Sequence, residues 1–580
     1  MSPKQWPFDI QTAQRLVRVA LGHEEADLVL RDATYLNVFT ETWERGDIAI
    51  ADGRIAGTGK YQGKTEISAE GQYVVPGFID GHIHLESSLV SPAEFARAVV
   101  PYGTTAVIAD PHEIANVLGL DGIEYIKQAS AGLPLDVWLM LPSCVPATEE
   151  DESGAILSHE DILPLYDDPR VLGLAEMMNF PGVLRGDESV LQKIKTAHDC
   201  GAQIDGHAPG LSGKGLNAYI VCGITSDHEC STLEEAKEKI SKGQWVLMRE
   251  GTAAHNLRAL IPLLSTPCAS RCLFATDDKH PEDLCSSGHM QSIISQAVQF
   301  GADPIVTLKA ASYNAACAFS LTGYGAIAPG YTADIVILKD LKNFQVLTTI
   351  KNGKTVFDKR LMSITEPTVD PALAEKACHT FHMPELSAES FALETPAGVI
   401  KLVPGQIISE NGGLTEGVDP SRDIVKIAVA ERHQNTGHIG IGYLQGYGLK
   451  RGAVATSIAH DSHNLIVAGV NDEDMACAAN RVRELGGGIV LVVDGKICGE
   501  LALPIAGLMS PDSLMNVNTT LERLKQTARF LGTTKYIDPF MTLSFMSLPV
   551  IPSLRILTRG VFDVDTWSYV VQPDNAPAHE

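Results

Sequence analysis

The sequence predicts an α/β protein built around a (β/α)8 TIM barrel, and three observations lead to this fold class. Between residues 76 and 320, short apolar runs alternate with helical stretches, which is typical of parallel strands joined by helices. There are eight such runs, counting the one that leads into this region. A barrel of eight strands needs roughly 250 residues, which matches the length of this region. Polar residues that can bind metals follow most of these runs. A doubly wound parallel sheet is the competing fold.

The first apolar run, Val74 to Ile79, leads into Asp80-Gly81-His82-Ile83-His84. Alternate residues of a strand point to the same face, so His82 and His84 should converge on one place. Two neutral imidazoles arranged in this way suit a divalent transition metal. The eight expected strands are 74–79, 105–109, 137–141, 171–174, 202–205, 223–225, 245–248 and 272–275.

The later strands end in further polar residues, and the active site of a barrel lies at the carboxyl ends of its strands. Taken singly, each has an ordinary explanation, such as a hydrogen-bonded histidine or an aspartate that caps the next helix. Taken together, they predict one cluster at the barrel mouth. In chain order these residues are Asp110, His112, Glu113, Glu176, His207, His228, Asp277 and Asp278.

Four histidines, one glutamate and one aspartate could hold two divalent metal ions, with the carboxylate of Glu176 bridging them. A water molecule between two dications ionises near neutral pH and becomes a nucleophile. Asp277, which directly follows its strand and is preferred to Asp278, would accept the proton of that water. The expected reaction class is hydrolysis at an electrophilic carbon. Imidazole and carboxylate ligands favour Zn²⁺, Mn²⁺ or Fe²⁺. The expected metal ligands are His82, His84, Glu176, His207, His228 and Asp277.

Two β-rich segments flank the barrel. In residues 1–75 we expect a helix at about 10–21, strands at 27–30 and 34–38, and a hairpin around Asp52-Gly53, a dipeptide that suits a type I′ turn. In residues 321–365 we expect another strand and hairpin. We expect these segments to form one discontinuous β domain. The alternative is two unrelated hairpins.

Residues 385–580 predict a separate α+β domain. A linker punctuated by three X-Pro steps precedes it. A helix is expected at 472–485, capped by Asn471 or Asp472 and ended by Gly486-Gly487-Gly488, and a hairpin follows around Asp494-Gly495. The segment His460-Asp461-Ser462-His463-Asn464 predicts an extra metal or substrate contact, or else a polar turn.

Composition excludes several classes of partner. The formal net charge of −26 argues against nucleic acid. No apolar run is long enough to predict a membrane span, and the first residues lack the pattern of a signal peptide. The 11 cysteines are scattered and odd in number, which predicts a reducing, cytoplasmic location without disulfides.

The predicted metal ligands and their motifs resemble the amidohydrolase superfamily and, within it, the family of bacterial adenine deaminases. The last of these motifs lies in a C-terminal domain that most amidohydrolases lack, so it is the most discriminating. The resemblance covers nearly the whole chain. It rests on the segments 81–88, 110–114, 275–278 and 459–464.

The resemblance implies that adenine and water react to give hypoxanthine and ammonia in purine salvage. It implies a binuclear Mn²⁺ or Fe²⁺ centre, with Zn²⁺ as the remaining choice, and a homo-oligomer, taken to be a dimer. Glu176 matches the glutamate that this family uses where many relatives carry a carboxylated lysine. Asp277 would accept a proton, and His112, Glu113 and Glu86 are candidates for the group that donates one.

Two alternatives stay open. One is another amidohydrolase reaction on the same centre, with a different aminopurine or a cyclic amide as substrate. The other is a barrel that has lost its chemistry and serves as a binding or assembly protein. The intact set of predicted ligands argues against the second.

Overall fold

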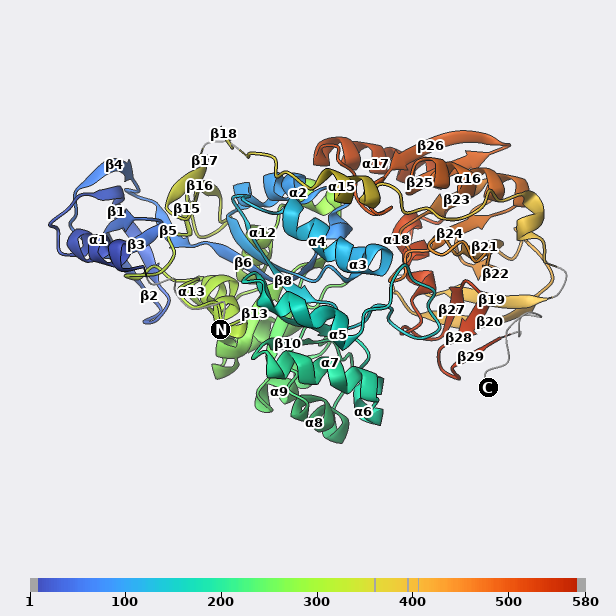
Figure 1. Ribbon diagram of the computed structural model, residues 1–580, viewed down its shortest axis with the longest axis horizontal. Coiled ribbons are helices and arrows are strands. Elements are labelled where there is room, and N and C mark those ends of the chain that lie inside the picture. The colour runs from blue at the N-terminus through green and yellow to red at the C-terminus, as the bar shows by residue number, and fades with distance from the viewer. Residues whose placement is uncertain (1–8, 359–360, 363, 394–395, 405, 571–580) are drawn as a thin grey trace.

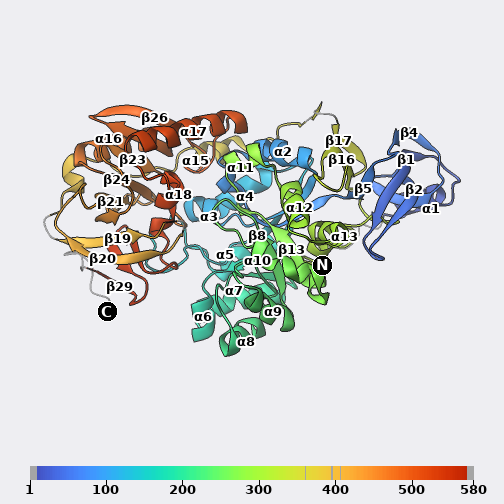
Figure 2. The same ribbon diagram turned by 180° about the vertical axis from the view of Figure 1, so that it is seen from behind.

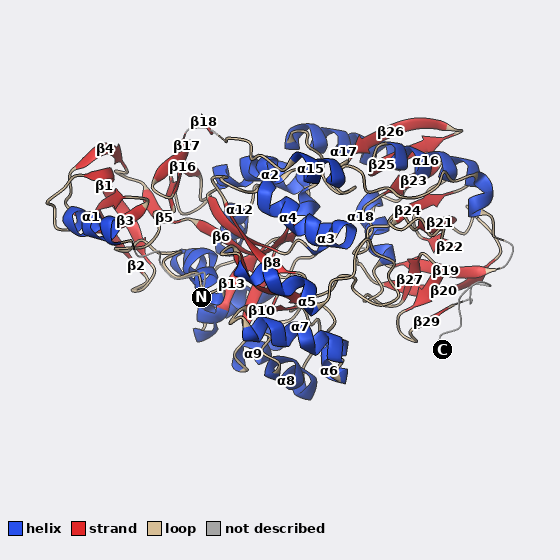
Figure 3. Cartoon of the chain, in the orientation of Figure 1, coloured by secondary structure: helices blue, strands red, loops and turns tan. Residues whose placement is uncertain are grey.

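The computed structural model describes residues 9–570 except 359–360, 363, 394–395 and 405. A β-rich part, a barrel and a C-terminal α+β part lie in a row, with the barrel in the middle (Figures 1 and 2). Figure 3 shows strands gathered in the centre of the barrel, with helices around them. The predicted fold class is confirmed.

The barrel is built from parallel strands that follow each other in chain order. Two sheets, β6 to β10 and β11 to β13, make up its wall. Thr225 N donates to Ile204 O at 3.0 Å and joins the sheets, and the short strand β14 pairs with β6 and closes the circle. The strands are β6 (Phe78–His84), β7 (Thr104–Ala109), β8 (Asp136–Leu141), β9 (Val171–Met177), β10 (Gln203–Gly206), β11 (Ser226–Asp227), β12 (Trp245–Arg249), β13 (Cys272–Ala275) and β14 (Asp277–Asp278).

Helices cover the outside of this wall. Because both faces of the strands are covered, β7 and β9 are buried along their whole length, as expected for parallel strands. The helices are α2 (Pro92–Val99), α3 (His112–Leu118), α4 (Leu120–Ala129), α5 (His159–Ile162), α6 (Phe180–Arg185), α7 (Glu188–Asp199), α8 (Gly213–Val221), α9 (Leu233–Ser241), α10 (Leu257–Leu260), α11 (Pro281–Ser286), α12 (Met290–Gln299), α13 (Pro304–Lys309) and α14 (Ala315–Ala318).

Two expected barrel strands are wrong in their bounds. The run 74–79 is divided at Gly77, where a Cβ would lie 2.2 Å from Thr105 Oγ1. Its first half, β5 (Tyr73–Pro76), pairs outside the barrel, and the barrel strand begins at Phe78. The strand expected at 223–225 lies at 226–227 instead, because Gly223 takes a φ of +93° just after α8 ends.

The β-rich part joins both flanking segments in one sheet, in the order β18-β17-β16-β15-β5-β1-β2-β3, with β4 beside β1. The two strands expected at 27–30 and 34–38 are one strand with an irregularity near Asp32, whose φ is +53°. The elements are α1 (Ile10–Ala20), β1 (Ala26–Asn37), β2 (Thr42–Ala51), β3 (Arg54–Gly59), β4 (Gly63–Ser68), β15 (Ile335–Leu338), β16 (Val346–Lys351), β17 (Lys354–Asp358) and β18 (Leu361–Met362).

The C-terminal part has a mixed sheet in the order β20-β19-β22-β21-β24-β23-β25-β26. The expected helix begins at Asp472, and its N-cap is Asn471, whose side chain accepts from Asp474 N at 2.7 Å. The elements are α15 (Pro371–Ala377), β19 (Ala397–Leu402), β20 (Ser409–Thr415), β21 (Ile424–Ala430), β22 (Ile439–Gln445), β23 (Ala453–Thr456), β24 (Leu465–Gly469), α16 (Asp472–Glu484), β25 (Gly488–Val493), β26 (Lys496–Ala502), α17 (Leu514–Phe530), α18 (Pro539–Ser544), β27 (Leu554–Leu557), β28 (Gly560–Asp563) and β29 (Ser568–Tyr569).

Among the described residues, no helix combines the length and the apolar character needed to cross a bilayer.

Candidate metal centre

The six residues expected to bind metal lie together at the carboxyl end of the barrel, and only His207 is partly exposed. His82 and His84, on β6, direct their Nε2 atoms to the same place, and these two atoms are 3.2 Å apart. His84 Nε2 also lies 3.1 Å from Asp277 Oδ1. The strand geometry that predicted this convergence is therefore present.

Glu176 lies between two groups of histidines. Its Oε1 is 3.3 Å from His84 Nε2 and 3.7 Å from His82 Nε2. Its Oε2 is 2.7 Å from His207 Nδ1 and 3.3 Å from His228 Nε2. The two oxygens of this carboxylate therefore face different sets of imidazoles.

The partners of the first two histidines fix which nitrogen of each ring carries hydrogen. His84 Nδ1 lies 3.1 Å from the carbonyl oxygen of Asp110, which can only accept, so Nδ1 donates. His82 Nδ1 lies 3.1 Å from Asp205 Oδ2 and donates to it. In the neutral rings, both Nε2 atoms therefore present lone pairs to each other at 3.2 Å. A cation beside them relieves this repulsion, so the donor set fits a divalent metal ion.

Asp277 and Asp278 have different partners. Asp277 adopts a left-handed backbone conformation, with φ +59°, and its Oδ2 accepts from the Arg249 guanidinium. Asp278 lies in the same cluster, but its Oδ1 accepts from the hydroxyl of Ser87. Asp277 is thus held by a cation on one side and faces His84 on the other.

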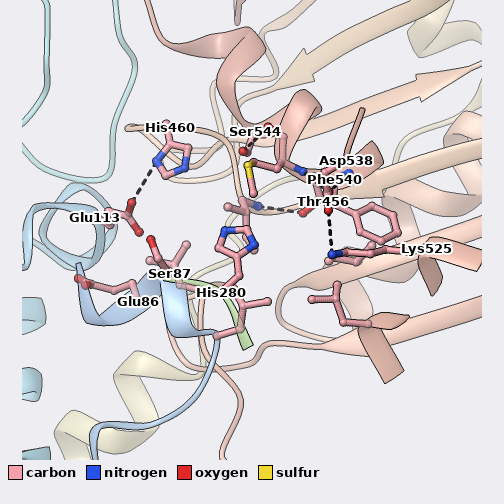
Figure 4. Close-up of a pocket in the computed structure, with 16 residues that line it drawn as sticks. Glu86, Ser87, Glu113, His280, Thr456, His460, Lys525, Asp538, Phe540 and Ser544 are labelled. Carbon is pink, nitrogen blue, oxygen red and sulfur yellow. Dashed lines mark hydrogen bonds and ion pairs between the residues drawn. The ribbon is translucent and has the colours of Figure 1, made fainter. Parts of the chain in front are cut away.

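His112 and Glu113, the other catalytic candidates, begin helix α3. His112 Nδ1 is 3.2 Å from Asp110 Oδ2 and 4.0 Å from Glu176 Oε1, so this ring borders the cluster. Glu113 Oε1 instead lies 3.0 Å from His460 Nδ1, in the C-terminal part of the chain (Figure 4). The two neighbours therefore make different contacts.

The third candidate, Glu86, is buried beside Glu113. Its Oε1 accepts from Ile114 N at 3.1 Å, and its Oε2 has no hydrogen-bond partner among the described residues. Burial, together with the negative charge of Glu113, raises the pKa of Glu86 to about 7. Burial also favours a higher pKa for Glu113, but the nearby His460 outweighs it and holds that pKa well below the usual range.

Several residues around the cluster were not predicted. Arg249 ends the seventh barrel strand and binds both Asp277 and Glu229. It therefore lies at the carboxyl end of a barrel strand, like the predicted residues. It was missed because arginine is not a metal ligand. Asp205 lies on β10, two residues before His207. Its contact with His82 could not be predicted from the sequence, because the two residues lie far apart in the chain.

The segment 459–464 of the C-terminal part reaches the barrel mouth. Asp461 Oδ1 lies 3.8 Å from His112 Nε2. Asn464 Nδ2 donates to Glu152 O at 2.7 Å, and His438 Nδ1 lies 2.8 Å from Glu152 Oε1. The C-terminal part therefore contacts the barrel beside the candidate metal centre.

Comparisons with known proteins identify the family of this chain. The sequence model of the amidohydrolase family matches residues 73–356, which span the barrel, and the model of the adenine deaminase C-terminal domain matches residues 406–568. Among solved structures, the dihydropyrimidinase of Brevibacillus agri is similar over 58% of this chain and 95% of its own, with 15% identity and a TM-score of 0.45. The class defined by the matched family and the barrel is that of the amidohydrolases, which are hydrolases.

Two relatives match over nearly their whole length. "Adenine deaminase 2" of Carboxydothermus hydrogenoformans is 48% identical and covers 96% of this chain and 98% of its own. "Adenine deaminase" of Clostridium acetobutylicum is 46% identical, with coverages of 96% and 99%. At this identity and coverage, the chain belongs to the adenine deaminase family of amidohydrolases, enzymes that hydrolyse C–N bonds.

Proposed function

We propose that this protein hydrolyses adenine to hypoxanthine and ammonia at a centre of two divalent metal ions. One observation carries the proposal: in a member of this family, the two oxygens of Glu176 face separate pairs of histidines, next to Asp277. The proposed ligands are His82, His84, Glu176, His207, His228 and Asp277. Mn²⁺ or Fe²⁺ is the proposed metal, and Zn²⁺ has the same ligand preferences.

The bound metal ions would supply Lewis acidity and lower the pKa of a water molecule to near neutral. As the oxygen of a water molecule bonds to C6 of adenine, the C6=N1 π bond opens, N1 takes a proton from an acid, and Asp277 accepts a proton of the water. Arg249 keeps Asp277 ionised and oriented for this task, because its guanidinium binds the second carboxylate oxygen. The C6–N bond then breaks, and the amino group leaves as ammonia once it has gained a proton.

The three candidates for the proton donor differ in their surroundings. Burial opposes protonation of His112, but Asp110 and Asp461 outweigh it and raise its pKa well above the usual value. Glu86, with a pKa of about 7, also carries a proton for part of the time at neutral pH. Glu113 is held ionised by His460. His112 and Glu86 therefore fit proton donation better than Glu113, which fits the task of holding His460.

We also propose a place in purine salvage, a cytoplasmic location and a homodimer. The structure describes every cysteine of the chain, and all 11 are free, which supports a reducing compartment. The net charge of −26 supports a small-molecule substrate over nucleic acid. The dimer stays a prediction, which sedimentation analysis of the full chain can test.

Ammonia release from adenine tests the proposed function. The Mn²⁺-loaded protein is compared with the same protein after removal of metal by a chelator. We expect release that depends on metal and returns when Mn²⁺ is restored. No release from protein that demonstrably holds two metal ions would overturn adenine as the substrate and leave another aminopurine or a cyclic amide.

A further inference from the structure

We propose that the purine ring of the substrate binds in a cavity between the barrel and the C-terminal part, and that the C-terminal part supplies most of its wall. The inference rests on the proposed function and adds the location and the character of the substrate pocket. Sixteen residues line the cavity, five from the barrel and eleven from the C-terminal part. Figure 4 shows the residues that surround it.

The cavity begins beside the candidate metal centre. Ser87, which lines the cavity, donates a hydrogen bond to Asp278, and Asp278 lies in one cluster with His84 and Asp277. A ring placed here can therefore present one edge to the metal centre. The barrel residues that line the cavity are Glu86, Ser87, Leu89, Glu113 and His280.

The opposite wall is largely apolar and belongs to the C-terminal part. It is formed from the end of β23 and the segment after it, from β25 and from helices α17 and α18. Such a wall suits the flat faces of a heterocycle, whose transfer from water is favourable. The apolar residues of this wall are Ile458, Ile489, Leu508, Leu521, Phe540 and Met541.

Most lining residues on the barrel side are polar, and the edge of a purine needs hydrogen bonds there. Glu86 is buried and lines the cavity, and its Oε2 has no hydrogen-bond partner among the described residues. A buried polar atom of this kind is costly unless it is paired. A ring nitrogen or an N–H group of the base supplies the missing partner.

The charges in the cavity favour a free base over a nucleotide. Lys525 lines the cavity, but its Nζ lies 2.9 Å from Asp538 Oδ2 and 2.6 Å from Glu282 Oε2. This cation is therefore already neutralised by two carboxylates. His460, the other cation of the lining, is paired with Glu113 at 3.0 Å. A phosphate group would therefore find no free cation among the lining residues described, so the pocket suits an uncharged nucleobase.

Two matched substitutions in the C-terminal part test the inference. Ile458 lines the cavity, while Ile441 packs in a different apolar cluster, and both are partly buried. We expect Ile458→Phe to fill the pocket and to weaken hypoxanthine binding by about tenfold or more, measured by calorimetry on Mn²⁺-loaded full-length protein. The KM for adenine should rise in parallel. Ile441→Phe should change neither, and both variants should keep the metal content of the wild type.

The outcomes separate the inference from the proposed function. If the wild type releases ammonia from adenine but Ile458→Phe binds hypoxanthine as tightly as the wild type, the pocket assignment is wrong and the proposed function stands. If Ile458→Phe fails to fold, Phe540→Leu removes an aromatic wall of the same cavity and should raise the KM and weaken hypoxanthine binding severalfold. Unchanged binding in that folded variant would likewise overturn the inference. A wild type without activity on adenine refutes the proposed function instead.

Discussion

Glu113 of the barrel and His460 of the C-terminal part form a buried ion pair, with 3.0 Å between Oε1 and Nδ1. A second contact lies beside this pair. Asp461, the residue after His460, places its Oδ1 3.8 Å from Nε2 of His112, the residue before Glu113. Two adjacent residues of α3 therefore meet two adjacent residues of the segment 459–464. The C-terminal part is thus tied to the helix that carries two of the catalytic candidates.

This ion pair predicts how stability depends on pH. Burial alone would lower the pKa of His460, but Glu113 outweighs it and raises that pKa to about 9. The folded-state pKa is therefore higher than the usual value of about 6.5. The stabilisation is complete below about pH 6.5 and is lost as the pH rises through about 9. We expect His460→Gln to lower the Tm strongly at pH 6 and much less at pH 9.5, in thermal unfolding measurements.

A second histidine serves as the control for this prediction. His438 also pairs with a carboxylate across the same boundary, at 2.8 Å from Glu152 Oε1, but its side chain is 46% exposed. Exposed pairs contribute little, so His438→Gln should lower the Tm slightly at either pH. If the Tm of His460→Gln runs parallel to that of the wild type from pH 6 to 9.5, the pair does not stabilise the protein in the way we infer.

Asp277→Asn should nearly abolish turnover while the fold persists. The amide cannot accept the proton of the attacking water, and general-base catalysis contributes about 100- to 10,000-fold. The measurement is kcat for ammonia release, with circular dichroism and metal content as checks. Asp278→Asn is the matched control, because Asp278 bonds to Ser87, and it should retain more activity. Near-normal turnover in folded, metal-loaded Asp277→Asn contradicts the proposed role.

The fold could be predicted where local pattern and burial agree. The strand Cys272–Ala275 is apolar and buried at every position, and helix α16 starts at the predicted place with a predicted cap. The division of the run 74–79 could not be predicted. Val74 to Pro76 and Phe78 to Ile79 are equally apolar, and the first half is set apart by its pairing with β1 and with β15, which is more than 250 residues away in the chain.

The site could be predicted in part for a similar reason. Parallel strands bring their carboxyl ends to one edge, so residues at strand ends must meet whatever their distance in sequence. This rule predicts that Glu176 and Asp277 lie close to His84, and in the structure both do. It says nothing about a second domain, so the contacts of His112 with Asp461 and of Glu113 with His460 became visible only in the structure.

The position of Glu176 predicts an effect on metal stoichiometry. Glu176→Gln replaces one charged oxygen by an amide nitrogen, which cannot bind a cation, so one side of the bridge is lost. We expect the purified variant to hold fewer than two metal ions per chain, measured by elemental analysis after dialysis. Glu229→Gln is the control: Glu229 lies 3.4 Å from His228 Nε2 but pairs with Arg249, and it should keep both ions. Equal metal content in the two variants refutes the bridging role.

Asp205 should control metal affinity without binding the metal. Its Oδ2 lies 3.1 Å from His82 Nδ1 and orients that ring, while its Oδ1 accepts from the hydroxyl of Ser226. Replacement of such a partner lowers metal affinity about 10- to 100-fold. We expect Asp205→Asn to lose metal to a chelator at a correspondingly lower concentration, measured by competition with a metal-sensitive dye. Ser226→Ala removes only the bond to Oδ1, so it should change the affinity far less. Equal affinities in Asp205→Asn and the wild type mean that His82 is oriented by other contacts.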